Sequence, residues 1–180
     1  SEIAGAYCTK LLCDGGADII KIEAPGRGDP LRRWSASGTP LAPDQDGALF
    51  QHLNASKRGI VLDLANASDR ETLLSLAATA DLVVESFAPG ALQSLGLGLA
   101  ALQARNPMLS LVSISPWGGS GPYALRPSTE FTLQAATGSI DYRGLRERKP
   151  VAAGGRIGEW AGGVFAAVGA LSAALSARRT

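Results

Sequence analysis

Two glutamates, Glu130 and Glu159, have the residue type and the setting for carboxylate chemistry. Each stands where a helix is predicted to begin, and there the unsatisfied backbone N–H groups and the positive end of the helix dipole favour an ionised carboxylate. An ionised carboxylate can act as a nucleophile. Glu159 also follows a run of small residues, Gly154-Gly155-Arg156-Ile157-Gly158, that would let a substrate approach closely. The alternative interpretation is that both glutamates are ordinary helix-start charges, which are common.

Other kinds of site find little support in the sequence. His52 is the only histidine and has no serine in a nucleophile elbow to activate, so we interpret it as a surface or supporting residue. Cys8 and Cys13 fit neither a zinc-ligand spacing nor a disulfide framework, which predicts reduced cysteines in a cytoplasmic protein and no metal site. The glycine-rich runs at 96–98 and 118–121 lack the dinucleotide-binding and Walker patterns, and we interpret them as turns.

Composition indicates one globular α/β domain. The 180 residues are 46% hydrophobic and 18% charged, with a net charge of +1, which favours neither nucleic acid nor an anionic membrane as a partner. The first four residues lack the basic and apolar regions of a signal peptide. Residues 160–177 are nearly uncharged but rich in Ala and Gly, so we interpret them as a helix buried in a core or subunit interface rather than a membrane span.

The elements that must position the two glutamates alternate between strands and helices, which predicts an open, mostly parallel sheet of the Rossmann-like kind with flanking helices. The predicted strands are Asp18–Glu23, Gly59–Leu64, Asp81–Glu85 and Leu109–Ile114, and the predicted helices are Ala6–Cys13, Ser68–Thr79 and Leu99–Arg105, with two more from about Thr129 and about Glu159. Ser68 is the predicted N-cap of its helix, with Glu71 completing a capping box.

Three segments rich in Gly, Pro or charge predict long loops, at 26–50, 116–128 and 142–155. The predicted order lacks the first strand of a doubly wound domain, since the chain opens on a predicted helix. We therefore expect this chain to be a fragment of a larger protein.

Five motifs in register resemble the signatures of the class III CoA-transferase/racemase family, the CaiB/BaiF type. They are GADIIKIE at 16–23 with Gly28-Asp29-Pro30-Leu31-Arg32, NASKRGIVLDL at 54–64, VESFAPG at 84–90, LGLG at 95–98, and SIS at 113–115 with Gly118 and Gly121-Pro122-Tyr123. Together they extend over essentially the whole chain.

The resemblance implies a particular fold and assembly. Members of the family have a large Rossmann-like domain and a smaller second domain, are roughly twice this length, and interlock as homodimers. Residues 1–180 would then be the first part of the large CoA-binding domain, without the smaller domain, and the first strand would precede Ser1.

The resemblance also implies a reaction, the transfer of coenzyme A from an acyl-CoA to a carboxylic acid. In the transferases an aspartate attacks the thioester and forms a mixed anhydride, and Glu159 stands at that position with one more methylene. The implied CoA-binding residues are Ile3, Leu62, Asp63, Ser86, Phe87 and Ala88, largely through their backbone, together with Thr129 and Glu130. Ala24 replaces an arginine that often pairs with CoA phosphate, and Arg27, Arg32, Lys57 or Arg58 could compensate for that loss.

Two alternative functions remain open at this stage. One is a catalytically degenerate domain that binds or holds a dimer, motivated by Ala24 and Glu159. The other is an acyl-CoA racemase, which Thr129 disfavours because the racemases place a catalytic histidine at that position and threonine is a poor general base.

Overall fold

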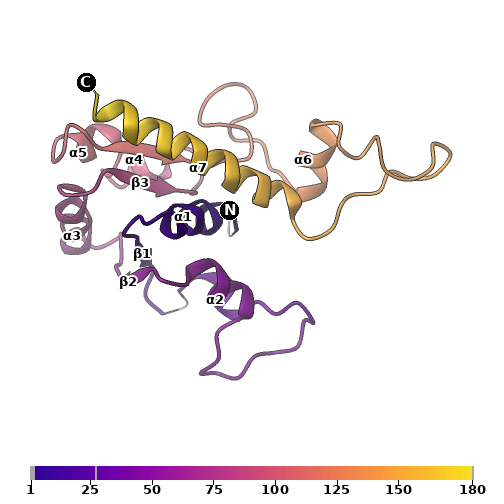
Figure 1. Cartoon of the computed structure of the whole chain (residues 1–180), viewed down its shortest axis with the longest axis horizontal. Coiled ribbons are helices and arrows are strands. Elements are labelled where there is room, and N and C mark those ends of the chain that lie inside the picture. Colours follow the sequence, from indigo (N-terminus) through magenta and orange to yellow (C-terminus); the bar gives the residue numbers. More distant parts are fainter. Residues whose placement is uncertain (1–2, 27, 180) are drawn as a thin grey trace.

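The structure is a computed structural model that describes residues 3–26 and 28–179. Its elements, shown in Figure 1, are α1 (Ile3–Asp14), β1 (Ile20–Glu23), the 3-10 helix η1 (Pro30–Arg33), α2 (Ala48–Asn54), β2 (Arg58–Val61), α3 (Ala67–Ala77), β3 (Leu82–Glu85), α4 (Ala91–Ser94), α5 (Leu99–Gln103), β4 (Ser110–Ser113), α6 (Glu130–Ala136) and α7 (Ile157–Ala177). The predicted α/β class with parallel strands is confirmed. All four predicted strands form, each somewhat shorter than predicted.

The strands pair in parallel as two separate two-stranded sheets, β1 with β2 and β3 with β4. In β3, successive side chains point to opposite faces, as a pleated strand requires. Val83 packs against one buried cluster, and Leu82 and Val84 pack against another. Both faces of this sheet are therefore covered, which accounts for the nearly continuous apolar sequence of the strand.

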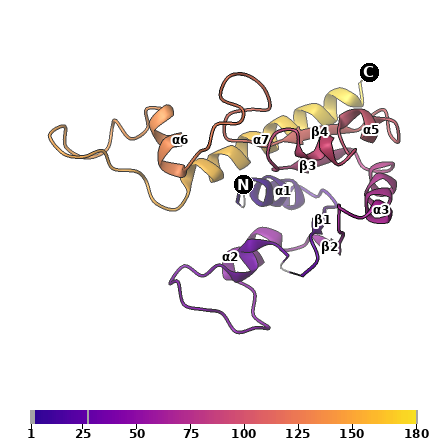
Figure 2. The same ribbon diagram turned by 180° about the vertical axis from the view of Figure 1, so that it is seen from behind.

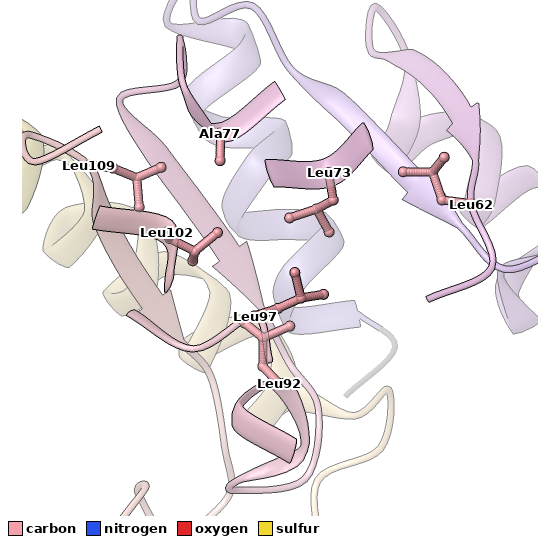
Figure 3. Close-up of a cluster of buried hydrophobic side chains, with 7 residues drawn as sticks. All are labelled: Leu62, Leu73, Ala77, Leu92, Leu97, Leu102 and Leu109. Atoms are coloured by element: carbon pink, nitrogen blue, oxygen red, sulfur yellow. The ribbon is translucent and has the colours of Figure 1, made fainter. Parts of the chain in front are cut away.

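The larger buried cluster joins both sheets to α3, α4 and α5 (Figure 3). Its buried members are Leu62, Leu73, Ala77, Leu92, Leu97, Leu102 and Leu109. Ile22 of β1 and Val83 of β3 both pack against it, so the two sheets share one core although no hydrogen-bonded ladder joins them within residues 3–26 and 28–179.

On the opposite face, α1 and α7 cover the β3–β4 sheet. Cys8 and Leu12 of α1 form a buried cluster with Ala167 and Ala170 of α7. The two views in Figures 1 and 2 both show α7 running along α1 and the β3–β4 sheet. This helix pair brings the amino ends of α1 and α7 together, and that junction holds the candidate site.

Two local predictions need correction. The N-cap of α3 is Asn66, whose side chain accepts a hydrogen bond from the Ser68 backbone N–H, so the predicted cap at Ser68 is wrong by two residues. Asparagine is as good an N-cap residue as serine. Asn66 directly precedes the first residue of α3, so its side chain can accept from the free N–H groups of the first turn. Helices α2 and α4 were not predicted, because both are too short to show the 3.6-residue repeat of apolar side chains.

Helix α7 is long and apolar enough to cross a membrane by length and composition, but it is the single such helix in the described residues, which is weak evidence for a span. One face, with Gly163, Ala167 and Ala170, is buried. The opposite face is exposed and apolar, with Val164, Phe165, Val168, Leu171 and Leu175. The expectation was a helix buried in a core or a subunit interface, and one face of α7 is buried in the core of this chain.

Candidate active site

The carboxylate of Glu159 joins the amino ends of two helices. It lies in the first turn of α7, and its Oε2 accepts a hydrogen bond of 2.7 Å from the backbone N–H of Ile3, the first residue of α1. Its Oε1 pairs with the guanidinium of Arg156. The Glu159 side chain is 16% exposed, so the carboxylate is held in place yet remains reachable.

The backbone before α7 is bent into an unusual conformation. Gly155 has φ +75°, and the N-cap residue Arg156 has φ +57° and ψ +44°, in the left-handed region that non-glycine residues seldom adopt. A strained residue of this kind is often found at functional positions. Here the bend leaves the Arg156 side chain beside the carboxylate three residues later.

Close packing of α1 on α7 explains why Ile3 reaches Glu159. Tyr7 and Trp160 meet edge to face, with ring centroids 4.7 Å apart. A Cβ atom on Gly163 would lie 2.9 Å from the carbonyl oxygen of Ala4, so only glycine allows this approach. The indole N–H of Trp160 donates to the carbonyl of Gly155, which ties the helix pair to the bent segment.

The second predicted carboxylate, Glu130, lies in the first turn of α6. Its Oε1 accepts hydrogen bonds from the backbone N–H of Gly158, at 2.7 Å, and from Gln134 Nε2, at 2.8 Å. Glu130 therefore caps the start of α7 from a neighbouring helix. Thr129 is the N-cap of α6, where its hydroxyl accepts from the Thr132 N–H in a capping box.

The predicted CoA contacts after β3 lie close to the start of α1. A Cβ on Gly5 would stand 3.3 Å from Ser86 Oγ, which places Ser86 directly against the first turn of α1. Phe87 is half exposed, its N–H donates to Glu85 Oε2 at 2.7 Å, and Ala88 is exposed. The structure thus brings Ile3 and Ser86 to one region.

The remaining predicted CoA contacts follow β2, in the other sheet. Leu62 is buried in the core and its N–H donates to the Glu23 carbonyl, so its side chain is closed to a ligand. Asp63 is exposed. An open hollow of about 440 Å³ lies at the carboxyl ends of β1 and β2, lined by Glu23, Ala24, Gly26, Gly28, Arg32, Gly59, Ile60 and Val61. Ligands of open α/β sheets bind at this end of the strands.

Arg32, one of the cations proposed to replace the missing arginine at Ala24, is engaged inside the protein. It forms a two-pronged ion pair with Glu23 and a third contact with Asp46 Oδ2, and its guanidinium lies 4.0 Å from the centre of the Phe50 ring. The hydrogen bond from Arg32 lowers the pKa of the Glu23 carboxyl. Arg32 therefore borders the hollow as part of a fixed ionic pair.

Lys57 and Arg58 also have internal partners. Lys57 Nζ donates to the Ala6 carbonyl and to Thr9 Oγ1, each at 2.8 Å, and to Asn54 Oδ1. Burial, followed by repulsion from Lys21, lowers the pKa of Lys57 to about 8. Arg58 pairs with Asp18. Arg27, the remaining candidate, lies outside the described residues.

Metal ligation has no evident location in the described part of the chain. Across residues 3–26 and 28–179, no group of three or more His, Cys, Asp or Glu side chains could hold a metal ion. His52 lies in the last turn of α2 and is exposed.

Two residues of the site were not singled out from sequence. Arg156 appeared only as part of a glycine-rich run, although its spacing of three from Glu159 is that of an i,i+3 ion pair. Gln134 stands four residues after Glu130 on one helix face, and the structure shows it 3% exposed and bonded to Glu130. The i,i+4 spacing was a readable signal, whereas the burial of Gln134 was not.

Comparison of the sequence with known proteins identifies a family. The sequence model of CoA-transferase family III matches residues 1–180. An acyl-CoA transferase of Fusarium pseudograminearum is 34% identical over 98% of this chain and 39% of its own length. A succinyl-CoA:mesaconate CoA-transferase of Haloarcula hispanica is 38% identical over 99% of this chain and 46% of its own.

The fold has a solved counterpart as well. A CaiB/BaiF family protein from Brucella suis superimposes with a TM-score of 0.90 at 34% identity, over 99% of this chain and 47% of that protein. The chain thus spans less than half the length of the relatives described here.

Proposed function

Because this chain belongs to CoA-transferase family III, we propose that the full-length protein transfers coenzyme A between carboxylic acids, with Glu159 as the nucleophile. The observation that carries the proposal is the position of Glu159, which is held between the start of α1 and the start of α7 by Ile3 and Arg156. A nucleophilic carboxylate needs to be fixed and accessible, and this one is bonded to Ile3 and Arg156 with its side chain 16% exposed.

The proposed chemistry begins with attack of a Glu159 oxygen on the thioester carbonyl carbon. The C–S bond breaks, coenzyme A leaves as a thiolate, and a mixed anhydride joins the acyl group to Glu159. The thiolate then attacks the glutamyl carbonyl and releases the first acid, leaving a glutamyl-CoA thioester. The acceptor carboxylate and CoA repeat the two steps in reverse. The Ile3 N–H can donate to negative charge that develops on the Glu159 carboxyl during these exchanges.

The substrates proposed are an acyl-CoA and a carboxylic acid. The named relatives act on such pairs, for example succinyl-CoA and mesaconate. Coenzyme A would extend along the carboxyl ends of the strands, from the hollow beside Ala24 to Ser86 and Phe87 near Glu159. Of the CoA contacts implied by resemblance, Ile3 and Glu130 would act mainly by holding the reacting end of the site, because both are bonded to α7.

We further propose that the full-length protein works as an interlocked homodimer in the cytoplasm. The exposed apolar face of α7 (Val164, Phe165, Val168, Leu171 and Leu175) supports additional protein contacts. The free thiols Cys8 and Cys13 suit a reducing compartment.

The first test is to trap the anhydride. Full-length protein incubated with succinyl-CoA and hydroxylamine should acquire a hydroxamate on the peptide that contains Glu159, found by mass spectrometry. Glu159→Gln should remove the adduct and lower the transfer rate by about a thousandfold or more, because an amide cannot serve as the nucleophile. Full activity in Glu159→Gln would overturn the proposal.

The Glu159→Asp variant tests whether the site is built for the longer side chain. Both carboxylate oxygens of Glu159 have partners. Shortening the side chain by one methylene would draw these oxygens back by about 1.5 Å, the length of one C–C bond. We expect a loss of about a hundredfold in kcat. A gain in activity would instead identify Glu159 as a poor replacement for an aspartate.

The alternative function, a degenerate domain that binds without catalysis, is favoured by one observation. Ala24 removes a phosphate donor, and Arg32, which borders the same hollow, is held by Glu23 and Asp46. Absence of the hydroxamate with a panel of acyl-CoA thioesters, together with no CoA binding in calorimetry, would support this alternative.

A further inference from the structure

Gln134 is the one buried polar side chain among the described residues, at 3% exposure. A buried amide is costly unless its hydrogen-bonding groups are satisfied. Nε2 donates to Glu130 Oε1 at 2.8 Å and to the Ala153 carbonyl at 3.0 Å, while Oε1 accepts from the Ala153 N–H at 2.8 Å and from Arg143 Nη1 at 3.1 Å. Both donors and both acceptor positions of the amide are therefore occupied.

The Ala153 backbone fixes which way the amide faces. Its N–H requires an acceptor and its carbonyl requires a donor, so Oε1 and Nε2 of Gln134 can take only the observed orientation. The second N–H of Nε2 then points to Glu130 and requires an acceptor there. Gln134 thereby orients the Glu130 carboxylate so that Oε1 accepts from the amide. The same oxygen accepts from the backbone N–H of Gly158.

Two contacts extend from Gln134 to the start of α7. Ala153 lies three residues before the bent N-cap Arg156, and Gly158, bound by Glu130 at 2.7 Å, immediately precedes Glu159. A Cβ on Gly158 would lie 3.1 Å from Glu130 Oε2, which shows how closely the two helix starts approach. We propose that Gln134 is a positioning residue that sets the place of Glu159 by fixing the segment before α7 and, through Glu130, its first turn.

This inference rests on the proposed role of Glu159 and predicts a specific kinetic effect. Gln134→Leu keeps the size of the side chain but leaves Ala153 and Glu130 without their partners. The first turn of α7 can then shift, and a shift of about 1 Å in a reacting group costs on the order of a hundredfold in rate. We expect kcat to fall by about ten- to a hundredfold while KM for succinyl-CoA changes little, because the Gln134 side chain is buried.

Gln134→Glu provides a readout that a merely structural residue would not give. The new side chain is isosteric, but when ionised it pairs with Arg143, cannot donate to Glu130 or to the Ala153 carbonyl, and repels Glu130. When protonated it keeps a carbonyl acceptor and has one O–H, which can restore one of the two hydrogen bonds that the amide donates. Its transfer rate should therefore approach that of the wild type as pH falls from 8 to about 5.5. It also carries the test if Gln134→Leu does not fold.

The experiment uses full-length protein, succinyl-CoA and hydroxylamine, with the rate of CoA release measured across pH. Gln103, a half-buried glutamine in α5 that donates to the Leu109 carbonyl, gives the matched controls Gln103→Leu and Gln103→Glu, which should match the wild-type pH profile. Folded Gln134 variants with wild-type kcat, a Gln134→Glu profile parallel to its control, or a raised KM at unchanged kcat would each overturn the inference. Glu159→Gln in the same assay separates the two proposals, because activity there would overturn the nucleophile and not the positioning of α7.

Discussion

Glu130 and Glu159 look alike in sequence, since each stands in the first turn of a helix, but their surroundings assign them different tasks. Glu130 accepts from Gly158 and Gln134 and stabilises the start of α7. Glu159 bridges to α1 and pairs with Arg156. Their positions on helices could be predicted from local pattern. Their partners could not, because Ile3 and Glu159 are 156 residues apart in the chain.

Lys57 shows another residue whose role depends on distant contacts. Its ammonium group lies among three acceptors from α1 and α2, and no sequence pattern distinguished it from a solvated lysine before a strand. The lowered pKa of about 8 follows from burial, which penalises the charged form.

The pKa of Lys57 leads to a prediction about stability. Between about pH 8 and the usual lysine value of about 10.4, the unfolded chain binds a proton that the folded chain has lost, so this group makes the free energy of unfolding rise with pH. Below pH 8 it contributes no slope. We expect a rise of about 1–2 kcal/mol over this window, less than the full shift implies because water screens part of the side chain.

Urea unfolding from pH 7 to 10.5 measures this effect. Lys57→Met should remove the rise, while the exposed Lys149→Met should keep it. Identical slopes in Lys57→Met and Lys149→Met would show that Lys57 keeps an ordinary pKa in the folded protein.

At the scale of the element, α7 contains one glycine at a close helix contact and another with open space around it. Gly163 meets the Ala4 carbonyl and Tyr7, whereas a Cβ on Gly169 would meet no atom within 4 Å. Alanine normally stabilises a helix relative to glycine by about 1 kcal/mol. Overpacking of a close contact costs about 1–3 kcal/mol.

We therefore expect opposite effects from the same substitution. Gly169→Ala should raise the free energy of unfolding by up to about 1 kcal/mol, and Gly163→Ala should lower it by about 1–2 kcal/mol. Gly163→Ala should also lower activity, since it pushes α1, and with it Ile3, away from Glu159. Thermal unfolding with parallel rate measurements checks both. Equal stabilisation by the two variants would contradict the close α1–α7 packing.

Helices were predicted where the residues that begin and end them were clear, and were missed or misplaced where they were not. The helices predicted from about Thr129 and about Glu159 begin at Glu130 and Ile157, close to the predicted positions. For α3, both Asn66 and Ser68 are good capping residues, and the Glu71 spacing favoured Ser68, although Asn66 is the N-cap. The four-residue α4 depends on tertiary packing of Leu92 in the core, which local pattern does not reveal.

At the scale of the whole molecule, the sequence predicted the class but not the pairing. Short β-branched strands between helices predicted parallel strands, and the structure confirms them. Their division into two ladders depends on which strands become neighbours in space, and the order of strands along the chain does not determine it. The motifs at 16–23 and 54–64 contain β1 and β2, so the segments that carry the family resemblance include the strands themselves.

The loops after η1 and after α6 extend away from the body of the protein in Figure 1. They differ in how they are anchored. Arg33 donates to the carbonyls of Ala42 and Gln45 within the first loop. The second returns to the body at Ala153 through Gln134. Both loops were predicted from composition, but not the side chains that hold them.

The division into two ladders has a consequence for amide hydrogen exchange. In a parallel strand, successive N–H groups point to opposite edges. The N–H groups of Ser110 and Ile114 donate to the backbone at the two ends of β3, so those of Leu111 and Ser113 point to the edge that no strand covers in the described residues. Exchange at Leu111 and Ser113 should therefore be much faster than at Ile114. Slow exchange at all three amides would reveal that another polypeptide segment has added itself to this edge of the sheet.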